Sequence, residues 1–144
     1  MQIYYFYAHT ASQQMYIQLQ PIADVEPEFT WVDCYRDDVI HRLEQWQQDV
    51  YDCTQLRLNE LHVKDIQNIE HPCTFDTMDD YDLLIFRKLI TPTDQIISGD
   101  NALEEHERLF GLTTTPVSFI TTNNVLISIR ERGNRALENY VARV

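Results

Sequence analysis

The sequence predicts a single α/β (α+β) domain in which a mixed β-sheet is layered with helices on its faces. Its 144 residues suit one domain with one hydrophobic core. Strand-like stretches outnumber helical ones, and the helical stretches divide the strands into groups, which is typical of a layered sheet. The chain contains no repeat, low-complexity tract or linker. We therefore expect residues 1–144 to form one unit.

The first third of the chain predicts three strands. IYYFY at Ile3–Tyr7 is β-branched and aromatic, and MYIQLQ at Met15–Gln20 alternates apolar with polar residues. A loop containing Pro21 and Pro27 then leads to a third strand, FTWVDC, at Phe29–Cys34.

The next segment changes to a helical period. Asp37 and Asp38 stand at its start, where a carboxylate caps free N–H groups and meets the positive end of the helix dipole. A second helix is expected from about Asn59 to Asn68, with Asn59 as its N-cap and Pro72 preventing much extension. The apolar residues of the first helix recur three or four apart: Val39, Ile40, Leu43, Trp46 and Val50.

The second half of the chain predicts further strands and two helices. Cys73–Asp76 and Asp82–Ile90 are expected strands around an acidic turn, and the run Leu83–Phe86 is apolar enough for burial on both faces. Other expected elements are a helix at Ala102–Phe110, a hairpin of Pro116–Thr122 with Asn124–Arg130, and a helix carrying Ala136, Leu137, Tyr140, Val141 and Val144.

The charge balance is strongly acidic, with 11 basic and 23 acidic residues and a formal net charge of −12. Such a surface repels nucleic acid and anionic membranes and suits cations, basic partners or solubility. Cys34, Cys53 and Cys73 form no CxxC pair, so we expect free thiols rather than disulfides or a zinc site. The chain shows neither a signal peptide nor a spanning segment, so we expect a soluble, cytoplasmic domain.

Catalytic motifs are absent from the sequence. The isolated glycines Gly99, Gly111 and Gly133 form neither a P-loop nor a dinucleotide fingerprint, and there is no HExxH or GxSxG. We therefore expect no enzyme, no catalytic residue and no cofactor-binding residue. The histidines are scattered, and exposed or structural roles are expected for them: His9, His41, His62, His71 and His106.

Carboxylates that could bind a metal ion occur at two places in the sequence. The run Asp76, Asp79, Asp80 and Asp82 lacks the alternate spacing and the glycine of an EF-hand loop, so a solvated turn is expected there. Asp65 stands out because a helical wheel places it on the same broad face as four apolar residues. Burying the Asp65 carboxylate on that face without a partner would cost several kcal/mol. A backbone cap, a basic partner, a cation at a subunit interface or rotation toward solvent would each satisfy it. The four apolar residues are Leu58, Leu61, Ile66 and Ile69.

The stretch LHVKDIQNIEHPCTFDTMDDYDLLIF, at Leu61–Phe86, resembles the signature of the N-terminal soluble domain of CorA-type magnesium transporters. FTWVDC is similar to the family's Trp-Ile-Asp-Leu strand, TTTPVSFITTNNVLISIRER to its late hairpin, and LENYVARV to the start of the helices before its stalk. Three features depart from the family: Lys64 replaces a glutamate, Pro72-Cys73-Thr74 replaces Arg-Pro-Lys, and Ile90–Thr115 is longer than usual.

The resemblance implies a Mg²⁺-sensing regulatory domain at the cytoplasmic face of the membrane. It implies truncation before the stalk and transmembrane helices, and partnership with those parts and neighbouring subunits in a homopentamer. It also implies that Asp65 binds regulatory Mg²⁺ weakly, with a second carboxylate on a neighbouring stalk helix. Mg²⁺ prefers hard oxygen ligands and keeps several waters, so one or two carboxylates suffice. Three alternatives stay open: a zinc-transporting member of the family, a stand-alone acidic protein-interaction domain, and a small hydrolase or transferase, which would need a deep pocket with converging His, Cys and Asp side chains. The transported ion and its direction are not encoded in these residues.

Overall fold

The computed structural model describes residues 1–12, 14–89, 113–133 and 139–140. They form one mixed seven-stranded sheet with the strand order β2-β1-β3-β7-β6-β5-β4. The expected mixed sheet with helices is thus confirmed. The strands are β1 (Gln2–Ala8), β2 (Met15–Gln18), β3 (Phe29–Tyr35), β4 (Thr74–Thr77), β5 (Asp82–Leu89), β6 (Thr114–Thr121) and β7 (Val125–Arg130).

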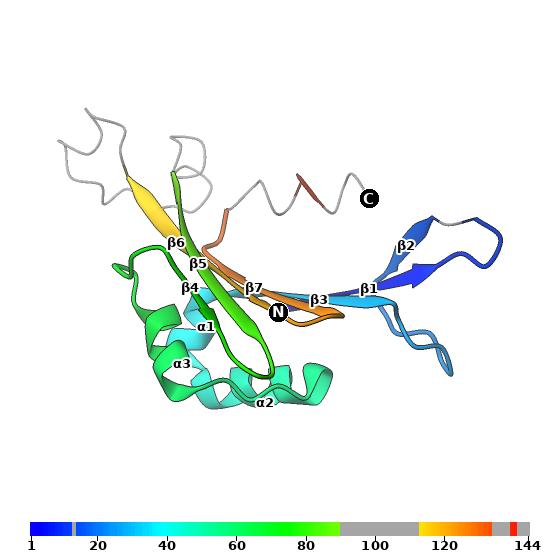
Figure 1. Ribbon diagram of the computed structural model, residues 1–144, viewed down its shortest axis with the longest axis horizontal. Helices are drawn as coiled ribbons and strands as arrows, with labels where there is room; N and C mark the ends of the chain where they lie inside the picture. Colours follow the sequence, from blue (N-terminus) through cyan, green and yellow to red (C-terminus); the bar gives the residue numbers. More distant parts are fainter. Residues whose placement is uncertain (13, 90–112, 134–138, 141–144) are drawn as a thin grey trace.

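Pairing is antiparallel throughout the sheet except between β3 and β7, which run parallel at its centre. A parallel pair needs a long crossover, and here the crossover contains three helices. These helices cover one face of the sheet (Figure 1). They are α1 (Arg36–His41), α2 (Leu43–Thr54) and α3 (Glu60–Gln67).

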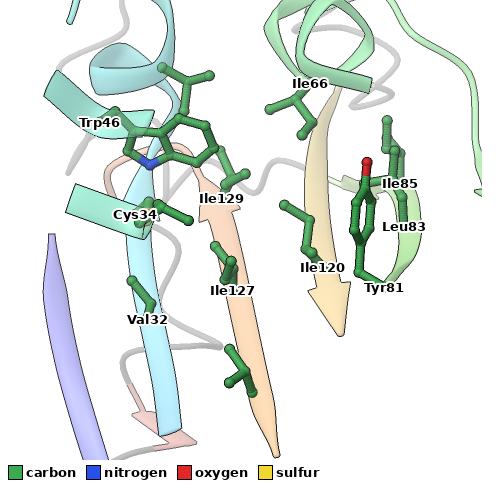
Figure 2. Packing of buried hydrophobic residues seen from close by; sticks show 13 residues of the cluster. Val32, Cys34, Trp46, Ile66, Tyr81, Leu83, Ile85, Ile120, Ile127 and Ile129 are labelled. Atoms are coloured by element: carbon green, nitrogen blue, oxygen red, sulfur yellow. The ribbon is translucent and has the colours of Figure 1, made fainter. Parts of the chain in front are cut away.

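The core lies between these helices and the sheet. Trp46 of α2 and Ile66 of α3 point toward the strands (Figure 2) and pack with Ile127 and Ile129 of β7, which are fully buried. Burying each such isoleucine side chain contributes about 1.5–3 kcal/mol. The β-branched central strands therefore hold the helix layer in place, and with it the surface that α3 presents to solvent.

Three sequence-based expectations need correction. The first helix is interrupted at Arg42 (φ −133°, ψ 42°), so α1 and α2 are separate helices. Asp37 and Asp38 lie in the first turn of α1, but its N-cap is Tyr35 and no side chain caps it. The run Leu83–Phe86 is not buried on both faces. Leu83 and Ile85 are fully buried, whereas Leu84 is 39% exposed, because α1, α2 and α3 all lie on the other side of the sheet.

The other expected strands, the hairpin and the second helix are present. The hairpin consists of β6 and β7, and Thr122 bonds the backbone of Asn124 and Val125 at its turn. The helix expected at Ala102–Phe110 and most of the expected C-terminal helix lie outside the described residues. No helix in the described ranges has the length and apolar character needed to cross a bilayer.

Candidate functional site

Helix α3 carries the candidate site and begins as the sequence predicts. The Asn59 side chain accepts a hydrogen bond from the backbone N–H of Leu61 at 2.8 Å, which satisfies one of the free donors of the first turn. The C-cap is Asn68, whose N–H bonds the carbonyl oxygens of Lys64 and Asp65. The cap and the buried residues together fix which face of α3 meets the core.

The buried face of α3 differs from the expected one. His62, Val63 and Ile66 face the core, while Leu61 is 67% exposed and Ile69 is 54% exposed. The helix is therefore turned so that the predicted stripe is divided: Ile66 faces the core, Leu61 faces solvent and Asp65 is partly exposed. The expectation that Leu61 and Ile69 pack inside is wrong, because a polar residue, His62, takes a core position.

His62 can be buried because both of its ring nitrogens have partners. Nδ1 lies 2.7 Å from the Tyr81 hydroxyl, and Nε2 lies 2.7 Å from Oδ2 of Asp76. The Tyr81 hydroxyl also accepts the backbone N–H of Asn59 at 2.9 Å. Burial raises the pKa of Tyr81, so the phenol stays protonated and can donate to His62. This array fastens α3 to β4 and to the start of β5.

Asp65 lies at the surface, with its side chain 39% exposed. Its Oδ1 is 3.3 Å from Nε2 of His71, which the loop after α3 brings back toward the helix. Within that loop the His71 N–H donates to the Asn68 carbonyl, and the Glu70 N–H donates to the Asn68 side chain. The residue singled out by the sequence thus has a histidine partner that was expected to be isolated.

Arg87 on β5 holds this loop against the sheet. Its Nη1 donates to the carbonyl oxygens of Ile69 (2.9 Å) and His71 (3.0 Å), while Nη2 and Nε bond Thr114. The local sequence gives no sign of this contact, because Arg87 is 16 residues beyond His71. The position of His71 therefore depends on a tertiary contact that periodicity and motif spacing do not reveal.

The acidic run does not form a metal cage. Asp79 and Asp80 are exposed in the turn between β4 and β5, whereas Asp76 bonds His62. Across residues 1–12, 14–89, 113–133 and 139–140, no three His, Cys, Asp or Glu side chains are grouped to hold a metal ion. Asp65 and His71 would therefore need water or another chain to complete a coordination sphere.

The sheet face opposite α1–α3 contains an apolar groove of about 520 Å³. Tyr140 reaches this face, with its ring centroid 5.7 Å from that of Trp31 in an edge-to-face arrangement. The lining of the groove is mainly apolar and contains no cluster of ligating groups. Its lining residues are Phe6, Met15, Phe29, Trp31, Phe119, Leu126 and Tyr140.

No protein-family model matches the chain, and no curated protein matches it in sequence. Solved structures do match. The complete CorA magnesium transporter of Methanocaldococcus jannaschii matches with a TM-score of 0.60 and 11% identity, over 99% of this chain and 36% of that one. The soluble domain of CorA from the same organism matches with a TM-score of 0.51 and 14% identity, over 95% of this chain and 43% of that one.

The ZntB cytoplasmic domain of Vibrio parahaemolyticus RIMD 2210633 matches with a TM-score of 0.53 and 16% identity, covering 99% of this chain and 51% of that one. The chain thus spans about a third to a half of the length of these structures. Sequence identities of 11–16% establish the fold alone. The fold of this chain is that of the CorA soluble domain and the ZntB cytoplasmic domain.

Proposed function

We propose that this chain is the cytoplasmic regulatory domain of a CorA-type divalent-cation transporter. In this role it senses Mg²⁺ and controls a membrane pore that these 144 residues do not contain. The likeness of nearly the whole chain to the CorA soluble domain supports this role. The net charge of −12 favours association with cations. In the full-length protein the domain would contact its own stalk and transmembrane helices and the neighbouring subunits of a pentamer.

The observation that carries the proposal is the partly exposed position of Asp65. Its carboxylate lies on the outward side of α3, next in helical phase to the exposed Leu61. A carboxylate bordered by exposed apolar side chains suits a surface that meets another chain. Two carboxylates facing each other across such a contact repel unless a cation lies between them. Ion binding therefore favours the associated state, as a sensor requires.

Magnesium suits this kind of control because it binds weakly to a few carboxylates. It keeps several waters and needs only one or two protein oxygens, so it leaves readily when its concentration falls. In the proposed mechanism Asp65 supplies one oxygen ligand, and a carboxylate of a neighbouring subunit supplies another. Loss of the ion then frees the subunits to move and opens the pore.

The test starts from the coding sequence beyond Val144 and continues with Mg²⁺ flux. Two transmembrane helices encoded downstream support the transporter, whereas a stop codon there favours a stand-alone acidic interaction domain. With the full-length protein in proteoliposomes, Asp65→Asn should raise the Mg²⁺ concentration that closes the pore by several-fold. Asp76→Asn is the matched control, since the Asp76 carboxylate is hydrogen-bonded to the ring of His62. Equal Mg²⁺ inhibition of wild type and Asp65→Asn would remove Asp65 from the sensing role.

A zinc-transporting protein is the second candidate. The likeness to the ZntB cytoplasmic domain supports it, since the TM-score of 0.53 is close to those of the two CorA structures. The same proteoliposomes distinguish the two, because a Zn²⁺-sensitive dye inside them reports zinc flux and a Mg²⁺-sensitive dye reports magnesium flux.

A further inference from the structure

Buried charges gather at one end of the sheet. Within the described ranges, the buried Asp, Glu, Lys and Arg residues are Asp33 on β3, Arg36 at the start of α1 and Arg130 at the end of β7. Strands β3 and β7 are the parallel pair at the centre of the sheet, and Tyr35 of β3 is paired in register with Arg130. The buried ionic side chains therefore surround the point at which the chain leaves β7.

The two arginines at this point contact β3 directly. Arg130 is paired with Asp33 at 2.9 Å. The guanidinium groups of Arg130 and Arg132 lie 5.0 Å and 4.3 Å from the centroid of the Tyr35 ring, which is within the range of a cation–π contact. One aromatic ring of β3 thus contacts the residue that ends β7 and a residue beyond the end of that strand.

Glu131, between the two arginines, has a partner of its own. It forms an ion pair with Nη1 of Arg36, whose side chain is 1% exposed. Nη2 of Arg36 also donates to the carbonyl oxygen of Pro116 on β6. Contacts from β3 and α1 therefore hold the chain as it leaves β7. The residues that make them, called the exit clamp below, are Asp33, Tyr35, Arg36, Arg130, Glu131 and Arg132.

Beyond the exit clamp the chain turns back across the sheet. Gly133 is buried and has a φ of 79°, a conformation that is costly for a residue with a Cβ but not for glycine. Further along, Tyr140 lies against Trp31 of β3, on the sheet face opposite α1–α3. The contact between Tyr140 and Trp31 therefore reports the direction in which the chain leaves the sheet.

Stability alone does not explain why ionic side chains are buried at this place. Replacing a buried ion pair by apolar side chains of similar volume often leaves a protein equally stable or more stable. Ionic contacts differ from apolar packing because they are satisfied only when donor and acceptor atoms meet in one arrangement. A buried ionic cluster at a chain exit therefore suits a role in setting direction.

We propose that the exit clamp fixes the direction in which the chain leaves β7 and thereby couples movement of this domain to the sequence that follows it. Arg36 and Glu131 are positioning residues in this device. A rigid exit passes a movement of the domain on to the next segment, whereas a loose exit absorbs it. The coupling rests on the proposed function, because it needs a pore to control, and the fixed direction does not.

The fixed direction is tested in the 144-residue chain by a nuclear Overhauser effect (NOE) between the rings of Trp31 and Tyr140. Arg36→Met/Glu131→Gln removes both charges of the buried pair, so this double variant should unfold at a urea concentration close to that of wild type. The NOE should nevertheless be lost, because the remaining contacts do not specify one direction. A stabilising role alone predicts the opposite, namely that the NOE is kept wherever stability is kept.

Asp80→Asn is the matched control, since it removes one exposed carboxylate from the turn between β4 and β5 and should keep the NOE. Backbone amide spectra establish that each variant is folded. Tyr35→Leu removes the ring beneath both arginines and should also weaken the NOE, so it decides the question if the double variant does not fold. Retention of the wild-type NOE in the folded variant that lacks the contact, or its loss in Asp80→Asn, would overturn the exit clamp.

The coupling is tested with the full-length protein in proteoliposomes. Arg36→Met/Glu131→Gln should remove most of the dependence of flux on Mg²⁺. Unchanged Mg²⁺ dependence in this double variant would overturn the coupling. Flux that is independent of Mg²⁺ in wild type would contradict the proposed function and the coupling with it, while the NOE would still decide whether the exit clamp fixes the direction of the chain.

Discussion

The ion pair between Asp33 and Arg130 is the most buried pair of opposite charges in the described sheet. Nη2 of Arg130 lies 2.9 Å from Oδ2 of Asp33, and their side chains are 4% and 9% exposed. The other oxygen, Oδ1, accepts the Ser128 hydroxyl, which in turn accepts the Trp31 indole N–H. The pair thus connects the parallel strands β3 and β7 at the centre of the sheet.

Arg130→Met should destabilise the domain by about 3–5 kcal/mol, because it leaves the Asp33 carboxylate buried without its counter-ion. Urea unfolding followed by tryptophan fluorescence measures this loss. The double variant Asp33→Leu/Arg130→Met removes both charges and should recover much of the stability. A double variant that is less stable than Arg130→Met alone would show that the pair itself, rather than the uncompensated charge, determines the effect.

Because of Cys34, the free energy of unfolding should fall as pH rises into the alkaline range. Burial raises the pKa of its thiol from 9.0 to about 12. Between these values the unfolded chain loses the thiol proton while the folded chain keeps it. The unfolded state then binds fewer protons, and stability falls as pH rises, by up to about 1.4 kcal/mol per pH unit. Stability from this thiol is complete below about pH 9 and is lost by about pH 12.

Cys34→Ala provides the comparison, since alanine does not titrate. Its smaller side chain should lower stability by a constant amount below about pH 9, and above pH 9 the difference should narrow because the variant's slope is shallower than that of wild type. Urea midpoints at several values between about pH 7 and pH 10.5 measure both slopes. Parallel curves for the two proteins would mean that Cys34 titrates equally in the folded and unfolded states.

At the scale of elements, α3 provides a test of which helix face meets the core. Ile66 is 1% exposed and packs in the core cluster, whereas Leu61 on the same helix is 67% exposed. Ile66→Ala should cost about 2–5 kcal/mol through lost burial and a cavity. Leu61→Ala should change stability by less than about 0.5 kcal/mol. If urea unfolding showed comparable losses of stability in the two variants, Leu61 would face the core, as the helical wheel predicted.

The elements also show where prediction from sequence ends. Local patterns were sufficient for the Asn59 cap and the β6–β7 hairpin, because caps and short turns depend on neighbouring residues. The exposure of Leu84 could not be predicted, since it depends on which sheet face the helices cover. Asp65 was singled out by its phase on α3, but its partner His71 is placed by Arg87 through a contact that local sequence does not encode.

At the scale of the whole molecule, charge opposes self-association of this chain. A net charge of −12 gives like-charged copies a mutual repulsion that is strongest at low ionic strength. Leu61 of α3 and Ile69 in the loop after it are exposed, and the partly exposed Asp65 lies on α3 one turn after Leu61. Bringing two such surfaces together without a cation would place carboxylates close to each other.

The 144-residue chain should therefore be monomeric in light scattering at micromolar concentration and low salt. Association, where it occurs, should increase with added divalent cation more than with the same ionic strength of NaCl, because a bridging ion neutralises facing carboxylates while monovalent salt only screens them. Asp65→Asn should reduce that difference, and Asp76→Asn should preserve it. A stable pentamer without divalent cations would contradict this expectation, because the apolar surface of this chain would then suffice to overcome its charge.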